Sequence, residues 1–285
     1  MDCLEISSIS SACGKNKYEP MYKTMLIQLC KSNKKKYITE MKNMGIIKDA
    51  DQDEVFYDTK LKGIYNNYKK RVIDTKEFNN IETEIISKII KEDPTITTQN
   101  INYIQEKIKN NLKKDCGTNN ETTVIDAKRY KKGNNRMWYY THENGWSIRG
   151  LHDASENDIV IEIKTRMKPQ NVRKNEYDLY QLFGYLLAMN KTKGKIVQKC
   201  NDIIYDSENE TDIEYGIIDI TEDKWINKFD TFIKELNEFF DKMYNTAIFP
   251  YEKVFQKRKN LIEIKENQVC KVSPEFEKLS KVLFT

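Results

Sequence analysis

Three charged residues in the centre of the chain have the types and spacing that metal-assisted phosphodiester hydrolysis requires. Asp153 follows Gly150 by three residues, and Glu162 and Lys164 stand two residues apart in a short apolar run. Residues two apart on a β-strand point to the same face, so Glu162 and Lys164 would share one face. Carboxylate oxygens suit Mg²⁺ or Mn²⁺. A neighbouring ammonium can hold a water or neutralise charge that develops on phosphate.

A structural interpretation of the same residues is also open. Asp153 could be a turn residue and Glu162 with Lys164 an exposed strand pair, because short motifs recur by chance in highly charged sequences. Three features favour function. Gly150 precedes Asp153 by three residues. Glu162 interrupts an otherwise apolar strand, where a charge without a role would be costly. A predicted helix follows closely, and it carries Gln181 and Tyr185 one turn apart on one face.

The elements that must position these residues predict an α/β fold. Period-two patterns predict strands at 123–127, 137–140, 146–150, 158–166 and 213–220. Helical spacing predicts helices at 21–47, 77–92, 98–113, 176–190 and 222–244. Asn144-Gly145 predicts a hairpin turn. If the strand before Asp153 pairs with the strand that holds Glu162, the two carboxylates converge. This order of elements is typical of a sheet with helices around it.

A polar, glycine-containing segment at 116–120 is predicted to be a loop and a boundary. It would separate a mostly helical N-terminal region, residues 1–120, from a core at 121–248. Residues 249–285 would form a C-terminal extension.

The composition excludes several other classes of protein. The chain has 285 residues, of which 39% are hydrophobic and 32% charged, as expected of a folded protein with a charged surface. A net charge of +4 means that nucleic-acid binding would depend on local basic patches. The six cysteines are scattered without a C-x-x-C pair, which disfavours a zinc site. No secretory signal and no membrane-spanning run is recognisable, so we expect an intracellular, soluble protein.

The central residues resemble a known superfamily. The ordered pattern is Gly150-x-x-Asp153…Glu162-x-Lys164…Gln181-x-x-x-Tyr185. It resembles the PD-(D/E)XK nucleases, and most closely the branch with RecB nuclease domains, lambda-type exonucleases and YqaJ-type viral recombination nucleases. The segment 10–18 is similar to the N-terminal Ser…Gly-x-x-x-Tyr motif of YqaJ-type proteins. The resemblance covers the central third of the chain and, more weakly, its first eighteen residues.

The resemblance implies a restriction-endonuclease-like fold, with a mixed central sheet flanked by helices and a helical N-terminal region. It implies a Mg²⁺-dependent DNA nuclease, with Mn²⁺ as a substitute, acting as an exonuclease on duplex ends in recombination, repair or viral DNA processing. Asp153, Glu162 and the backbone carbonyl of Ile163 would hold the metal, Lys164 would be the catalytic lysine, and Gln181 would belong to the downstream helix motif. A single-strand annealing protein and further copies of the chain are partners that it suggests. A structure-specific endonuclease and a non-catalytic nucleic-acid-binding module are the alternatives.

The same family usually adds an acid from a helix upstream of the sheet, which would serve as a further metal ligand. The best match is the segment 78–84, although the family's glycine is absent. Glu82 is preferred because Ile85 and Ile86 follow three and four residues later, which places it beside a buried stripe. Glu84 is the rival, and both glutamates could equally be solvated.

Basic residues around the predicted site could bind phosphates of a DNA strand. The candidates are Lys15, Arg149, Arg166, Lys168, Arg173 and Lys174, with Tyr185 beside them. Lys15 and Lys17 could bind a terminal phosphate. His152 adjoins Asp153, but strand alternation turns it to the other face, so we expect it to pack at the strand end.

Overall fold

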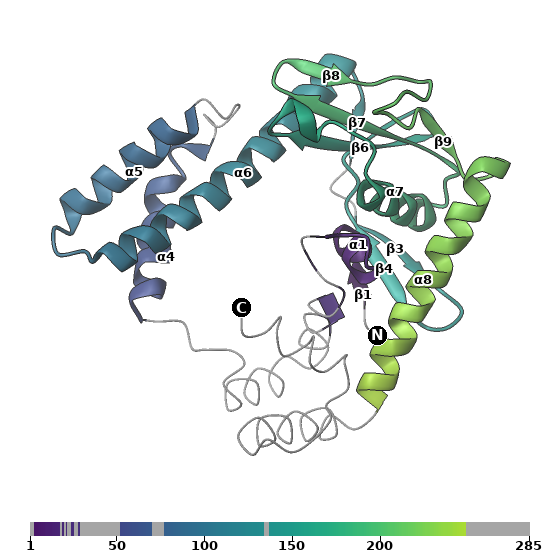
Figure 1. Cartoon of the computed structure of the whole chain (residues 1–285), viewed down its shortest axis with the longest axis horizontal. Helices are drawn as coiled ribbons and strands as arrows, with labels where there is room; N and C mark the ends of the chain where they lie inside the picture. The colour runs from purple at the N-terminus through teal and green to yellow at the C-terminus, as the bar shows by residue number, and fades with distance from the viewer. Residues whose placement is uncertain are drawn as a thin grey trace.

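The structure is a computed structural model of the chain (Figure 1). It describes residues 3–17, 19, 21, 24–25, 28, 52–69, 77–133 and 137–248. Most of the helix expected at 21–47, and the whole extension expected at 249–285, lie outside the described residues.

A six-stranded mixed sheet carries the predicted Glu-x-Lys strand. The strands along its path are β2 (Lys131–Lys132), β5 (Ala154–Glu156), β6 (Ile159–Arg166), β7 (Lys193–Cys200) and β8 (Ile203–Tyr205). β9 (Ile217–Asp219) also pairs with β7. β6 and β7 run parallel and every other pair is antiparallel. A separate three-stranded sheet has the order β1 (Cys3–Glu5), β4 (Ser147–Gly150), β3 (Trp138–Thr141).

Helix α7 (Glu176–Met189) lies between the two sheets, in contact with β6 and β7 on one side and β3 and β4 on the other (Figure 1). The short η1 (Ile6–Ser8) and α1 (Ile9–Ala12) pack against it, as does α8 (Asp223–Ile248). Gly184 permits the close approach of α1, because a Cβ there would lie 2.6 Å from Ile9 Cδ1. The main core therefore forms around α7, and the α/β fold with a helix-flanked mixed sheet is confirmed.

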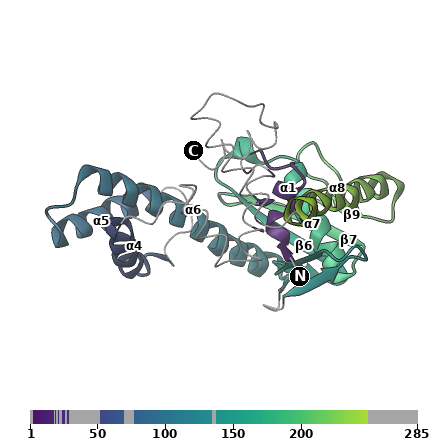
Figure 2. The same ribbon diagram turned by 90° about the horizontal axis from the view of Figure 1, so that it is seen from below.

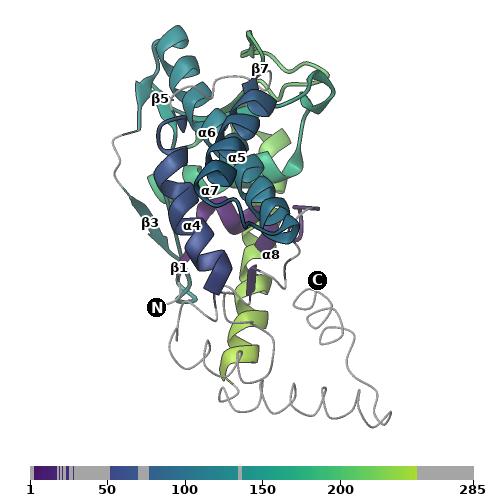
Figure 3. The same cartoon turned by 90° about the vertical axis from the view of Figure 1, so that its left-hand side faces the viewer.

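Helix α6 (Thr98–Lys128) joins this core to a separate helical unit, as Figure 2 shows. Its first half packs against α4 (Gln52–Tyr65) and α5 (Phe78–Glu92), which stand beside it in Figure 3. These three helices bury their own apolar cluster. The second half of α6 packs against β6 and belongs to a different cluster. At 1.5 Å per residue, its 31 residues span roughly 46 Å.

The loop expected at 116–120 and the strand expected at 123–127 are both wrong, because α6 continues through them. Buried positions recur every four residues along α6: Ile104, Ile108, Leu112, Cys116, Asn120 and Val124. The threonines near its end fit the helix, since Thr122 and Thr123 each donate a hydrogen bond to the carbonyl four residues earlier. The expected domain boundary at 120 therefore falls inside a helix.

The other elements follow the sequence with smaller differences. The hairpin at Asn144-Gly145 is confirmed between β3 and β4. The strand expected at 213–220 shrinks to β9, and β7 and β8 were not predicted. The turn η4 (Pro169–Asn171) lies in the loop between β6 and α7. No helix among the described residues is long and apolar enough to cross a membrane.

Candidate active site

The face of β6 that turns toward α7 carries the central pair. Glu162 and Lys164 share this face, as strand alternation predicts, and their Oε1 and Nζ atoms lie 2.6 Å apart. Lys164 Nζ also donates a hydrogen bond of 2.8 Å to Gln181 Oε1 on α7. Glu162 is only 1% exposed. The structure thus brings Glu162, Lys164 and Gln181 into one hydrogen-bonded group around a buried carboxylate.

Asp153 joins this group through a different strand from the one expected. β4 belongs to the second sheet and does not pair with β6, so the pairing considered in the sequence analysis is not formed. Instead the short β5, which begins directly after Asp153, pairs antiparallel with β6. Ala154 opposes Ile161, which sets Asp153 level with Glu162. Asp153 Oδ2 accepts a hydrogen bond of 2.8 Å from Ile163 N.

This hydrogen bond also orients the carbonyl of Ile163. The N–H and C=O of one residue in a strand point to the same edge, so the Ile163 carbonyl faces the edge that Asp153 occupies. β5 pairs only with residues 159–161 of β6, and this part of the edge is left to Asp153. The backbone oxygen named in the sequence analysis is therefore directed toward the carboxylates.

A third acidic residue, Glu121 on α6, completes the surroundings and was missed by the sequence analysis. Its negative charge raises the pKa of Asp153, and the charge of Glu162 raises the pKa of Glu121. Glu121 is partly buried, and burial is the largest cause of its raised pKa. The signal that could have found it is the four-residue stripe that continues α6 past residue 116.

The structure does not bring Glu82 or Glu84 to this group. Both lie on α5 in the separate helical unit. Glu82 Oε1 forms an ion pair of 3.5 Å with Lys109 Nζ on α6. The buried stripe beside Glu82 belongs to the core of the helical unit, so its position next to apolar residues does not indicate a place in the site.

The titration behaviour of the group shows that its carboxylates are crowded. Burial, and then the charge of Glu121, raise the pKa of Asp153 from 3.8 to about 6. Burial and the charge of Asp153 raise the pKa of Glu162 as well. Burial alone would lower the pKa of Lys164, but the charges of Glu162, Asp178 and Asp153, with the hydrogen bond to Glu162, together outweigh it and the pKa rises. Lys164 is therefore held as an ammonium ion among carboxylates that repel one another.

The donor set fits a divalent cation that prefers oxygen ligands. Glu162 Oε2 is buried and has no hydrogen-bond partner among the described residues, although a buried carboxylate oxygen normally has one. A cation would satisfy this oxygen and relieve the repulsion between Glu162 and Asp153. Across the described residues, no three Asp, Glu, His or Cys side chains are close enough to hold an ion by themselves. Backbone, water and substrate oxygens would have to complete the coordination, as is usual for Mg²⁺.

Two of the predicted DNA-binding residues instead hold the site together. Arg166 is 8% exposed, and its guanidinium donates to Asp178, to Tyr177 Oη at 2.7 Å and to Gln198 Oε1 at 2.8 Å. Tyr185 is buried, and its hydroxyl donates 2.6 Å to the carbonyl of Leu151. These contacts tie α7 to β6 and to the loop that leads to Asp153.

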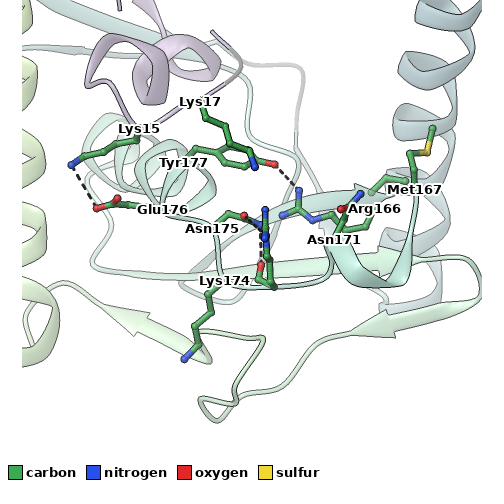
Figure 4. A pocket seen from close by; sticks show the side chains of 11 residues that line it. Lys15, Lys17, Arg166, Met167, Asn171, Lys174, Asn175, Glu176 and Tyr177 are labelled. Atoms are coloured by element: carbon green, nitrogen blue, oxygen red, sulfur yellow. Dashed lines mark hydrogen bonds and ion pairs between the residues drawn. The ribbon is translucent and has the colours of Figure 1, made fainter. Parts of the chain in front are cut away.

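The other basic residues gather around a pocket of about 460 Å³ at the end of β6 (Figure 4). Its cationic lining residues are Lys15, Lys17, Arg166, Arg173 and Lys174, against one acidic residue, Glu176. Lys15 forms ion pairs with Glu235 at 2.9 Å and with Glu176 at 3.6 Å. Lys174 pairs with Glu210. The pocket is therefore positively charged, although several of its cations already have partners.

The remaining candidates do not line this pocket. Lys168 is exposed on the loop after β6. Arg149 donates to Glu5 Oε1, 2.7 Å from its Nη2, across β4 and β1. His152 Nδ1 accepts a hydrogen bond of 3.1 Å from Trp138 Nε1, so it packs at the strand end as expected.

No protein-family model matches the sequence, and no curated protein is detectably similar to it. Two solved structures are weakly similar in shape. A crystal structure of SSO0001 aligns with a TM-score of 0.34 and 18% identity, over 56% of this chain and 70% of that one. A phage related exonuclease from Haemophilus somnus 129PT aligns with a TM-score of 0.31 and 10% identity, over 85% and 95% of the two chains. At this level of similarity neither structure assigns a family or a function.

Proposed function

We propose that this chain is a Mg²⁺-dependent DNA nuclease of the PD-(D/E)XK type, acting as an exonuclease on duplex ends. The observation that carries the proposal is the group at the edge of β6. One buried carboxylate oxygen of Glu162 has no hydrogen-bond partner among the residues that the structure describes, Asp153 stands level with Glu162, and Lys164 bridges Glu162 to Gln181. An unpaired buried carboxylate oxygen is costly to stability, and a cation site is the simplest reason to keep it.

Each residue of the group has a definite task in this proposal. Asp153, Glu162 and the Ile163 carbonyl would hold the ion, with Glu121 as a further acid on the α6 side. A bound Mg²⁺ or Mn²⁺ would supply Lewis-acid activation of the phosphate and of the attacking water. Hydrolysis joins the water oxygen to phosphorus and releases one ester oxygen as an alcohol.

Lys164 would act as a cation and not as a base. In the metal-free site the carboxylates around Lys164 raise its pKa, so its ammonium is protonated and donates hydrogen bonds. Gln181 fixes the direction of the ammonium by accepting one of its hydrogen bonds. Lys164 would hold the attacking water and offset the negative charge that grows on the phosphate oxygens.

The basic pocket next to Arg166 supports a nucleic acid as the substrate. It opens at Thr165 and Arg166, directly after Lys164 on the same strand. A nucleic-acid strand whose scissile phosphate lay at Asp153 and Glu162 could place a neighbouring phosphate among the cations of the pocket.

The test is digestion of linear and circular duplex DNA, single-stranded DNA and RNA with Mg²⁺, with and without a chelator. We expect metal-dependent shortening of linear duplex, and losses of at least about 10²–10³-fold in Glu162→Gln and Lys164→Met. Lys191→Met, at the end of α7, is the control. Circular dichroism should show all three variants folded.

The alternatives give different results in the same assay. Cleavage of circles as fast as linear DNA would assign an endonuclease. DNA binding by the intact protein without cleavage in Mg²⁺ or Mn²⁺ would assign a non-catalytic binding module and contradict the proposal.

A further inference from the structure

A short strand on the α6 side of the site carries a lysine that has no assigned role. β2 pairs with β5, and Lys132 stands directly opposite Ala154, the residue after Asp153. Ala154 in turn stands opposite Ile161 on β6. Lys132, Ala154 and Ile161 therefore form one row across three strands, next to the row of Asp153 and Glu162.

This strand is held against the site by close backbone packing. Gly133 N donates a hydrogen bond of 2.9 Å to the carbonyl of Asp153. A Cβ at Gly133 would lie 2.1 Å from the carbonyl oxygen of His152, so only glycine fits here without moving the backbone. The position of Lys132 relative to Asp153 is thus set by the backbone and does not depend on the conformation of a free loop.

Strand alternation separates Lys132 from its neighbour Lys131. Paired residues of adjacent strands point to the same face, and Ala154 and Ile161 are buried in the cluster beneath α6. Lys132 therefore projects on the α6 side, and Lys131 on the other side. Both lysines are exposed.

Glu121, an acidic residue of the site, is near enough to Lys132 for their charges to interact, but the two residues form no ion pair. Within the described part of the chain, its ammonium forms no ion pair, in contrast to Lys15 and Lys174 of the pocket. The charge of Lys132 lowers the pKa of Glu121, against the effects of burial and of Glu162.

We propose that Lys132 binds a backbone phosphate of the substrate beside Glu121, on the side of the carboxylates away from the basic pocket. Lys132 lies level with Ile161, and the pocket begins at Arg166, five residues further along β6. At about 3.3 Å per residue, Lys132 and Arg166 stand roughly 17 Å apart along the strand direction. Glu162 and Lys164 fall between them in register, but they lie on the α7 side of the sheet, whereas Lys132 lies on the α6 side with Glu121. A nucleic-acid strand that passed over the sheet edge at Asp153 would meet Lys132 on one side of the scissile phosphate and the cations of the basic pocket on the other.

This inference rests on the proposed nuclease function and names a substrate contact within it. A lysine that contacts one phosphate contributes through release of counterions, so its loss weakens binding at low salt more than at high salt. A lysine that acts only on Glu121 would instead change the metal concentration that the enzyme needs.

The experiment compares Lys132→Ala with Lys131→Ala, an adjacent exposed lysine with the same change of charge. Binding of a labelled linear duplex is measured at several salt concentrations, with Ca²⁺ in place of Mg²⁺ to prevent cleavage. We expect Lys132→Ala to bind several-fold more weakly. We also expect the slope of log K against log salt concentration to become less steep by about 1, the value for one lost phosphate contact. Lys131→Ala should match the wild type, and Lys132→Arg should restore most of the affinity.

Equal affinity and slope in the two alanine variants would overturn the inference, and so would an equal loss in both. A shift in metal requirement with an unchanged salt slope in Lys132→Ala would also overturn it. These results differ from failure of the proposed function, in which the wild type itself shows no metal-dependent cleavage. A wild type that bound no nucleic acid would overturn both.

Discussion

The two sides of the candidate site are built in different ways. On the α7 side, Glu162, Lys164 and Gln181 come from one strand and the helix that follows it, within twenty residues of sequence. On the α6 side, Glu121 comes from a long helix that belongs half to another core. The α7 side can be predicted from local periodicity in the sequence. The α6 side exists only because α6 continues to residue 128.

The contrast between Glu121 and Glu82 shows what this difference means. Both are helical glutamates next to a buried apolar stripe. Glu82 is paired with Lys109 inside the helical unit, while Glu121 interacts with Asp153 and Glu162. A buried apolar stripe beside an acidic residue shows only that the helix packs against a hydrophobic core. Whether that core belongs to the helical unit or to the sheet depends on the tertiary structure.

Replacing each glutamate by its neutral amide tests directly whether Glu121, and not Glu82, belongs to the site. We expect Glu121→Gln to lower cleavage by about 10–100-fold, most strongly at limiting Mg²⁺, because the site loses an acid that favours a bound cation. Glu82→Gln should cleave like the wild type. The measurement is the initial rate over a range of Mg²⁺ concentrations. A larger loss in Glu82→Gln would restore the interpretation based on sequence and remove Glu121 from the site.

The parts of the site that the sequence predicted are those that periodicity determines. Alternation places Glu162 and Lys164 on one face, and one-turn spacing places Gln181 on the helix face that meets them. The hairpin and α7 follow from equally local signals. Asp153 lies level with Glu162 as expected, but through a different strand, because the three residues of β5 are too few for a pattern to show.

The rest depends on contacts between distant segments. Gly117 and the threonines after it suggested a loop and a strand, yet their neighbours every four residues are buried in a helix. β7 was missed because lysines alternate along it as on an exposed strand. Lys195 and Lys199 are nevertheless buried, since Lys195 pairs with Asp206 and Lys199 Nζ donates to Asn120 Oδ1 at 2.8 Å.

The contact between Lys199 and Asn120 offers a finer test of how the α6 side is positioned. Asn120 immediately precedes Glu121, so this contact fixes the helix where the acid enters the site. Lys199→Met leaves Asn120 Oδ1 without this partner, which costs about 1–3 kcal/mol. We expect a several-fold higher Mg²⁺ concentration for half-maximal cleavage.

Lys195→Met is the matched control for that experiment, because it removes a buried lysine from the same face of β7 that pairs with Asp206 instead of Asn120. It should destabilise the fold without changing the metal requirement. An equal shift in both variants would mean that the metal requirement follows general stability, and that Asn120 has no particular part in placing Glu121.

The smallest expected effect concerns stability, and it tests whether the two sides repel each other without metal. The pKa of Asp153 is raised to about 6, and that of Glu162 is raised in the same direction. A carboxyl group whose pKa is raised on folding stabilises the fold fully below its unfolded value of 3.8, and this contribution is lost as the pH rises through its folded value. Metal-free protein should therefore melt lower at pH 8 than at pH 5, by about 2–4 °C per kcal/mol lost.

Glu162→Gln and Glu121→Gln should each flatten this pH dependence of the melting temperature, since each removes one of the repelling charges. Mg²⁺ should raise the melting temperature of the wild type most at pH 8. Differential scanning fluorimetry with a chelator and with Mg²⁺ measures both effects. A wild-type melting temperature that rose from pH 5 to pH 8 without metal would show that Asp153, Glu162 and Glu121 do not form one electrostatically coupled site.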